Sequence, residues 1–281
     1  MYQAYWGLKT TPFSTALDVR RFYQSQTYNE ALARLQFLVD AGRRAGLLLG
    51  PPGCGKSLLL EVLAGKLRRV GRRVTKLSLL GVDVHELLWT LATDWGQSPD
   101  TTSPDTTSPG TTISDFALWR IVGDTLESHR LQHVETVILL DDVDEATPEV
   151  LSAIARLAQS EPTSDARLTI VLASSTARVK NLGRRLLELA DLRIDIVPWD
   201  AGETERYIDR ALAQAGRTAP AFAAGAIARL ADLAEGVPRH VNQLADLTLL
   251  AAAAQKLDLI DAHTVEAVFD ELALINPVGA L

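Results

Sequence analysis

Short apolar runs alternate with longer segments of helical periodicity between residues 41 and 198. The runs have the length of buried strands and cover residues 45–49, 73–79, 136–140, 168–173 and 192–197. Between them, apolar residues recur every three to four positions and predict helices over residues 57–67, 83–95, 116–129, 148–159 and 177–189. Asp83, and Ser114 with Asp115, stand where N-caps are expected. The pattern predicts a core of alternating strands and helices.

The pattern changes after Pro198. Four alanine-rich helical segments follow, at residues 203–215, 221–234, 238–255 and 261–273. We therefore expect a helical domain over residues 199–281, behind a core over residues 41–198. Residues 1–40 form an arm rich in aromatic residues. Its rings are expected either to pack against the core or to border an adenine.

Residues 98–113 are rich in threonine, serine and proline and contain a five-residue near-repeat. This composition supplies too few apolar side chains for a core, and proline with β-branched threonine opposes a helix. We expect an exposed flexible loop that interrupts the core without ending it.

The stretch from Gly50 to Ser57 has a glycine, four free positions and then Gly-Lys-Ser, which is the phosphate-loop pattern. It follows a predicted strand and opens a predicted helix, as this motif requires. Gly53 and Gly55 let the backbone curl so that its N–H groups point at phosphate oxygens. Lys56 would neutralise the β and γ phosphates of ATP, and the Ser57 hydroxyl would hold Mg²⁺. The predicted nucleotide-binding residues here are Gly50, Pro51, Pro52, Gly53, Cys54, Gly55, Lys56, Ser57 and Leu58.

Two acids, Asp141 and Asp142, follow the third apolar run. At this distance beyond a phosphate loop, the pattern predicts that Asp141 binds Mg²⁺ beside Ser57. Asp142 would then face the γ-phosphate as the base or orienter of the attacking water, with Glu145 as the reserve candidate. The fourth run ends in serines, of which Ser175 suits either a γ-phosphate contact or an ordinary helix N-cap.

The composition restricts the class of protein and the cellular compartment in which such a site would act. The chain has 281 residues, 47% of them hydrophobic, and a single cysteine, which excludes an internal disulfide and fits a reducing compartment. Neither a membrane span nor an export signal is recognisable, so we expect a cytoplasmic protein. The net charge of −7 argues against an overall basic surface for nucleic acid. Residues 41–76 nevertheless carry a local excess of arginine and lysine, which suits nucleic acid, an acidic partner or plain solvation.

Taken together, these motifs resemble those of AAA+ ATPases. The segments Tyr5–Leu8, Pro12–Phe13, Glu203–Ile208 and Gly236–Asn242 narrow the resemblance to the ExeA, or general secretion pathway protein A, group. The similarity covers nearly the whole chain except the Thr/Ser/Pro insertion. It implies an α/β fold of the P-loop NTPase type, with a five-stranded parallel αβα core and a C-terminal helical lid.

The resemblance also implies roles for single residues. Lys56 and Ser57 correspond to Walker A residues and Asp141 to the Walker B acid. Ser175 is the sensor 1 candidate and Arg239 the sensor 2 residue. For the arginine finger given to a neighbouring subunit, Arg193 is the first choice, and Arg184 or Arg185 is the second.

The expected activity is ATP hydrolysis with Mg²⁺ at subunit interfaces, which controls assembly and the engagement of a protein partner. Asp142 stands where the family has glutamate, so we expect slow hydrolysis. We expect a homo-oligomer, either a ring, as a hexamer, or a helical filament. A role in secretion or envelope assembly is the first hypothesis. The alternatives are an ATP-dependent, DNA-binding transposition regulator and a nucleotide-binding scaffold that scarcely hydrolyses ATP.

Overall fold

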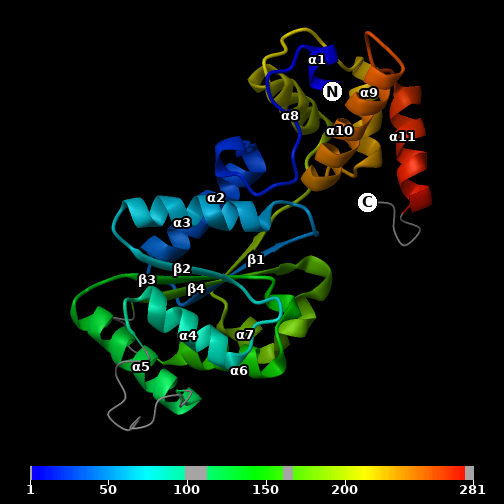
Figure 1. The fold of residues 1–281 in the computed structure, drawn as a ribbon. Coiled ribbons are helices and arrows are strands. Elements are labelled where there is room, and N and C mark those ends of the chain that lie inside the picture. The colour runs from blue at the N-terminus through cyan, green and yellow to red at the C-terminus, as the bar shows by residue number, and fades with distance from the viewer. Residues whose placement is uncertain (1, 99–112, 161–166, 276–281) are drawn as a thin grey trace. The chain divides into compact units, whose positions relative to one another are not determined.

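The computed structural model describes residues 2–98, 113–160 and 167–275 (Figure 1). The chain divides into two compact units. The sheet unit contains residues 28–50 and 56–196, and the helical unit contains residues 1–27, 51–55 and 197–281. The phosphate loop is therefore shared between the units. The predicted Thr/Ser/Pro loop lies almost wholly outside the described residues.

Five parallel strands form the sheet, in the order β2-β3-β4-β1-β5. They are β1 (Ala45–Gly50), β2 (Arg73–Ser78), β3 (Thr136–Asp141), β4 (Leu168–Ser175) and β5 (Leu192–Asp195). Every residue of β1, β3 and β4 is buried, because helices cover both faces of a parallel sheet. The predicted α/β fold with five parallel strands is confirmed.

Helices cover the two faces of this sheet (Figure 1). On one face lie α2 (Gln26–Asp40) and α3 (Lys56–Arg69), and on the other lie α4 (Val84–Asp94), α5 (Asp115–Leu131) and α6 (Pro148–Gln159). Leu47 and Leu49 of β1 belong to the core cluster that α4, α5 and α6 share. On the α2 side, a Cβ on Gly46 would lie 2.5 Å from a methyl of Leu38. Only glycine lets α2 pack this closely on β1.

Local signals set the helix ends. The Asp83 side chain accepts a hydrogen bond from the N–H of Glu86, and Ser114 accepts one from Ala117, so both predicted N-caps are present. One prediction is wrong, because residues 177–189 are not a single helix. A 3₁₀ helix (Thr176–Leu182) ends where Gly183 adopts a φ of 74°, and α7 (Gly183–Leu189) follows.

The helical unit contains α1 (Tyr2–Trp6), α8 (Ala201–Gln214), α9 (Ala224–Leu233), α10 (Pro238–Ala254) and α11 (Ala262–Ile275). Aromatic rings from the N-terminal segment form part of its core. The Trp6 ring is buried, and its Nε1–H donates to the Leu249 carbonyl at 2.9 Å. The Tyr23 ring meets the rings of Trp199 and Tyr207 edge to face. Residues 1–40 are thus divided, with their first part in this unit and α2 on the sheet.

Candidate nucleotide site

The C-terminal ends of the strands bring together most of the polar residues that the sequence singled out. In open parallel sheets, ligands bind beside these ends. The strand order places β1, which leads into the phosphate loop, next to β4, and β4 next to β3. Gly50 lies opposite Ser175 in the register, and Ser78 lies opposite Asp141. Four strand ends therefore meet at one edge of the sheet.

The phosphate loop has the backbone that its glycines were expected to allow. Gly53 and Gly55 have φ angles of 84° and 80°, a region that residues with a side chain rarely adopt. Lys56 is the first residue of α3, and its Nζ donates a hydrogen bond to the Gly50 carbonyl at 2.8 Å. Of the other loop positions, Cys54 is fully buried and Pro52 is exposed. Leu58, in the first turn of α3, is half-buried.

Asp141 and Ser57, the two predicted metal ligands, lie within hydrogen-bonding distance of each other. Asp141 ends β3 with only 4% of its surface exposed, and its carboxylate forms a hydrogen bond with the Ser57 side chain. Burial raises the pKa of Asp141, while the Ser57 hydrogen bond opposes that shift. A carboxylate and a hydroxyl group within hydrogen-bonding distance of each other offer two hard oxygen ligands of the kind that Mg²⁺ prefers. The residues present therefore fit a magnesium ion.

Asp142 takes an unusual backbone conformation, with φ 53° and ψ 38°. Aspartate tolerates this left-handed region better than most residues. Its N–H donates to the Asp141 carboxylate at 3.1 Å, and its own carboxylate accepts a hydrogen bond from the Ser78 hydroxyl at 2.8 Å. Ser78, which ends β2, is not among the residues predicted from the sequence. A serine at a strand end has no distinctive spacing, and only the strand order places it beside Asp142.

Behind these acids, a second group of charges orders the end of β4. The Asp144 carboxylate accepts a hydrogen bond from the backbone N–H of Ser175 at 3.1 Å. Glu145, the reserve catalytic acid, forms an ion pair with Arg178, whose guanidinium also lies 4.0 Å from Asp144. Ser175 itself is buried, with its main chain fixed by Asp144. The pairing with Arg178 gives Glu145 a structural partner and makes it a weaker choice than Asp142 for activating water.

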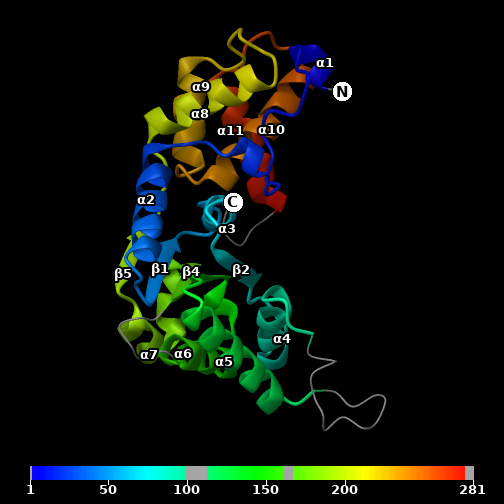
Figure 2. The ribbon, with the colours of Figure 1, turned by 90° about the vertical axis from the view of Figure 1, so that its left-hand side faces the viewer.

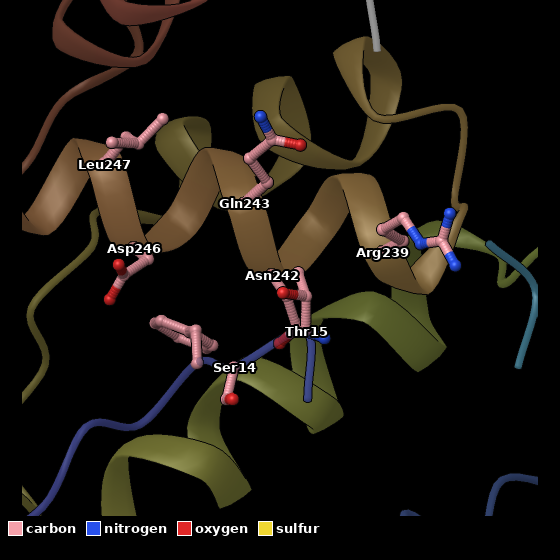
Figure 3. A pocket seen from close by; sticks show the side chains of 8 residues that line it. Ser14, Thr15, Arg239, Asn242, Gln243, Asp246 and Leu247 are labelled. Carbon is pink, nitrogen blue, oxygen red and sulfur yellow. The ribbon is translucent and has the colours of Figure 1, made fainter. Parts of the chain in front are cut away.

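Within the helical unit, the start of α10 contacts residues 51–55, the part of the phosphate loop that belongs to this unit. The Arg239 N–H donates to the Gly53 carbonyl at 3.3 Å. The preceding turn needs its glycine, because a Cβ on Gly236 would lie 1.9 Å from the Trp199 carbonyl oxygen. Arg239 also lies at one end of a pocket of about 790 Å³ (Figure 3). Its lining comprises Phe13, Ser14, Thr15, Arg239, Asn242, Gln243, Asp246 and Leu247.

A family model described as an AAA domain matches residues 39–182, just over half of the chain. The chain belongs to the AAA domain family. General secretion pathway protein A of Aeromonas hydrophila is 25% identical over 91% of the chain, which confirms the resemblance to that group of AAA+ ATPases. The chain spans only 45% of the length of that relative.

Solved structures share the fold of this AAA protein at low sequence identity. Cdc6p from Pyrobaculum aerophilum has a TM-score of 0.65 at 18% identity, over 90% of this chain and 71% of that one. The RuvB Holliday junction branch migration motor of Thermotoga maritima has a TM-score of 0.59 at 16% identity, over 94% and 74% of the two chains. The Aeropyrum pernix ORC1 protein, solved in complex with DNA, has a TM-score of 0.61 at 17% identity, over 86% and 64%.

Three arginines that follow the matched AAA segment are candidates for the finger, and each has a partner within the chain. The Arg193 guanidinium binds the Asp195 carboxylate through Nε and Nη2, at 2.8 to 3.1 Å. Arg184 forms an ion pair with Glu188 at 2.6 Å, and Arg185 donates to the Gln159 side chain at 2.6 Å. All three arginines are exposed. Among residues 2–98, 113–160 and 167–275, no helix is long and apolar enough to cross a membrane.

Proposed function

We propose that this AAA protein binds ATP together with Mg²⁺ and hydrolyses the nucleotide slowly. The observation that carries the proposal is the meeting of Ser57 and Asp141 at the base of the phosphate loop. These two residues would hold the ion, which supplies positive charge beside the phosphates. Lys56 would bind the β and γ phosphate oxygens, and the backbone N–H groups around Gly53 and Gly55 would cradle them.

Asp142 is the residue that we assign to the attacking water. Its carboxylate would orient the water and accept its proton, for which it must turn away from the Ser78 hydroxyl. Aspartate is one methylene shorter than glutamate, which sets the carboxylate back by about 1.5 Å. Misplacement on this scale reduces the rate of a reaction that depends on positioning. Both the shorter side chain and the hydrogen bond to Ser78 favour a slow switch over a fast motor.

The proposed assembly is a homo-oligomer in which one subunit completes the site of the next. Three exposed arginines lie on the segment from α7 to β5, and an arginine supplied in trans would stabilise the charge of the transition state. Hydrolysis would then depend on assembly and allow the nucleotide state to control engagement of a protein partner. The name of the Aeromonas relative favours a role connected with secretion.

A DNA-binding regulator is the second candidate function. It is supported by the arginines of residues 68–73 and by the DNA-related titles of two proteins that share the fold. Two of these arginines have partners within the chain. Arg72 binds Asp40 and Glu135, and Arg68 donates to the Val74 carbonyl. The secretion-related role remains our first choice, because the Aeromonas relative is 25% identical over 91% of the chain, whereas these two structures are similar in fold at 16% and 17% identity.

The experiment that tests the proposal is phosphate release by the purified protein, measured over a range of protein concentrations. We expect slow, Mg²⁺-dependent turnover whose specific rate rises with concentration as subunits assemble. Lys56→Ala should reduce the rate at least about 100-fold, because it removes the charge that holds the phosphates. Lys66→Ala, an exposed lysine on the same helix, is the matched control and should leave the rate unchanged. Equal rates for the two variants would contradict the assigned site.

A further inference from the structure

The N-terminal edge of the sheet carries exposed apolar side chains at three helix ends. In Figure 1 this edge lies on the left of the sheet, where α3 and α5 end, and Figure 2 turns that side toward the viewer. Phe37 near the end of α2, Val70 just after α3 and Leu131 at the end of α5 are 59%, 72% and 68% exposed. Side chains of this size and exposure are costly to leave in water when they lie near one another.

Arg72 shows that these three helix ends are neighbours. Its guanidinium lies 2.7 Å from the carboxylate of Asp40, the last residue of α2, and 2.5 Å from that of Glu135, just before β3. Val70 is two residues from Arg72, Phe37 is three from Asp40, and Leu131 is four from Glu135. Each apolar residue is thus within four positions along the chain of a residue in this bridge. We call the surface formed by residues 36–44, 66–73 and 130–135 the basic edge.

The charge of the basic edge is opposite to that of the whole chain. Its segments contain eight arginines and lysines and only two acids, whereas the chain has a net charge of −7. Both of these acids, Asp40 and Glu135, are bound by Arg72. Arg43, Arg69 and Arg73 are exposed. Two acids outside these segments also contact them, Glu127 at Arg130 and Asp191 at the Arg44 N–H. Eight basic residues still face only four acids, so the basic edge presents a local positive field.

Helix polarity explains only part of this arrangement. Cations are favoured near helix C-termini because they face the negative end of the dipole, so one or two arginines per helix end are expected. The same effect gives no reason for Phe37, Val70 and Leu131 to remain in water. Arginines around exposed apolar side chains are the combination by which peripheral proteins bind an anionic bilayer surface. The phosphates of nucleic acid would account for the arginines but not for the aliphatic side chains.

We propose that the basic edge docks on a membrane surface that contains anionic phospholipids. The exposed arginines would lie against the lipid phosphates, and Phe37 and Val70 would enter the boundary between headgroups and acyl chains. The ends of the strands that carry Asp141 and Asp142 are at the opposite edge of the sheet, so docking leaves them uncovered. The proposal concerns a partner of this surface and is independent of whether ATP is hydrolysed.

The test is co-sedimentation of the full chain with vesicles of phosphatidylcholine alone or with about one third phosphatidylglycerol, at several salt concentrations. We expect binding to the anionic vesicles only, weakening as salt rises. Arg43→Glu with Arg69→Glu should weaken it by about 25-fold or more, because each basic residue near an anionic surface contributes about fivefold. Phe37→Ser with Val70→Ser should weaken it by about tenfold, since less apolar surface leaves water.

The matched control variants carry the same kinds of substitution at exposed positions outside the basic edge. Lys180→Glu with Arg206→Glu makes the same charge change at exposed positions outside the basic edge, and Leu250→Ser with Leu259→Ser removes comparably exposed apolar groups. Both controls should bind like the unchanged protein, and thermal melts establish that every variant is folded. Binding that survives both basic-edge variants, or equal binding to neutral vesicles, would overturn the proposal. So would tight binding to duplex DNA without vesicle binding, which would assign the surface to nucleic acid.

Discussion

The two edges of the same parallel sheet differ in chemistry. At the C-terminal edge the polar side chains are few, range from the buried Asp141 to the exposed Ser78, and are joined by hydrogen bonds such as those of Asp141 with Ser57 and of Asp142 with Ser78. At the N-terminal edge arginines are numerous and exposed, and apolar side chains lie among them. A few side chains joined by hydrogen bonds, as at the first edge, suit the binding of a small ligand. Many exposed side chains, as at the second edge, suit contact with a large partner surface.

This difference follows from the connection of strands to helices. In a parallel αβα core, every helix begins near the C-terminal edge of the sheet and ends near the N-terminal edge. The first edge therefore gathers helix N-termini, which favour anions, and the second gathers helix C-termini, which favour cations. We propose that the chain uses the first edge to bind a nucleotide through the phosphate loop and Asp141. We infer that it uses the second to bind a membrane surface through Phe37, Val70 and Leu131.

The largest expected effect concerns Arg193, the arginine that we propose completes a neighbour's site. Arg193→Ala should lower turnover in the assembled protein by about 10³-fold, as expected for loss of a finger, while ATP binding to the single subunit stays unchanged. Arg184→Ala and Arg185→Ala, at the other exposed positions, should leave the rate near normal. Turnover and nucleotide affinity, measured side by side for the three variants, check this prediction.

Mixing two inactive variants tests whether the finger acts in trans. Arg193→Ala keeps its own phosphate loop, and Lys56→Ala keeps its arginine. In a mixed oligomer about one interface in four would pair an intact loop with an intact finger, so activity should return to about a quarter of normal. If Asp195 holds Arg193 back in the free subunit, Asp195→Asn should also raise the rate modestly at low protein concentration. No recovery on mixing would show that Arg193 does not act across subunits.

A smaller effect is expected at Asp142. Asp142→Glu should speed single-turnover hydrolysis by about tenfold, because the longer side chain brings the carboxylate closer to the attacking water. The gain is limited because glutamate is less well suited than aspartate to the left-handed backbone at this position. Asp142→Asn should slow the step by about 100-fold, since the amide accepts no proton. Single-turnover rates at saturating ATP report the chemical step directly.

Glu145 provides the matched control for this pair. Its carboxylate binds Arg178, so Glu145→Gln should leave the chemical step nearly unchanged. If Asp142→Asn kept the normal rate while Glu145→Gln lost it, the roles of the two acids would be reversed.

The sequence predicted features that depend on local spacing. The strands were found because runs such as residues 136–140 are buried on both faces and so are continuously apolar. The loop at Gly53 and Gly55 was found because its chemistry requires glycines at fixed positions. Asp141 followed from its place at a strand end.

Features that depend on strand order were not predicted. Ser78 lies beside Asp142 only because β2 is the neighbour of β3, which no local pattern reveals. Arg178 likewise reaches Glu145 from 33 positions along the chain. The arginines of residues 68–73 were noticed, but their association with Leu131 depends on three helices ending at the same edge. Long-range neighbours of this kind require the fold.

The smallest effect is expected at His129, near the N-terminal edge. Its ring is buried, its Nδ1 lies 2.9 Å from the Thr136 hydroxyl, and the Trp95 ring meets it edge to face. Burial lowers the pKa of His129, and the charge of Arg73 lowers it further. As pH falls below the unfolded value of about 6.5, the unfolded chain takes up this proton before the folded chain does. Stability should therefore decrease on acidification toward pH 5.

Replacing the imidazole isolates this contribution. His129→Gln should lose less stability than the unchanged protein between pH 7 and pH 5, as measured by denaturant unfolding at each pH. Its stability at pH 7 is expected to be lower because the contacts with Thr136 and Trp95 change, so the comparison rests on the slope with pH. If His129→Gln and the unchanged protein had the same slope, the acid sensitivity of the sheet unit would have to come from its carboxylates. Asp141 would not be among them, because burial raises its pKa, so the folded chain takes up that proton before the unfolded chain does and acidification favours the fold there.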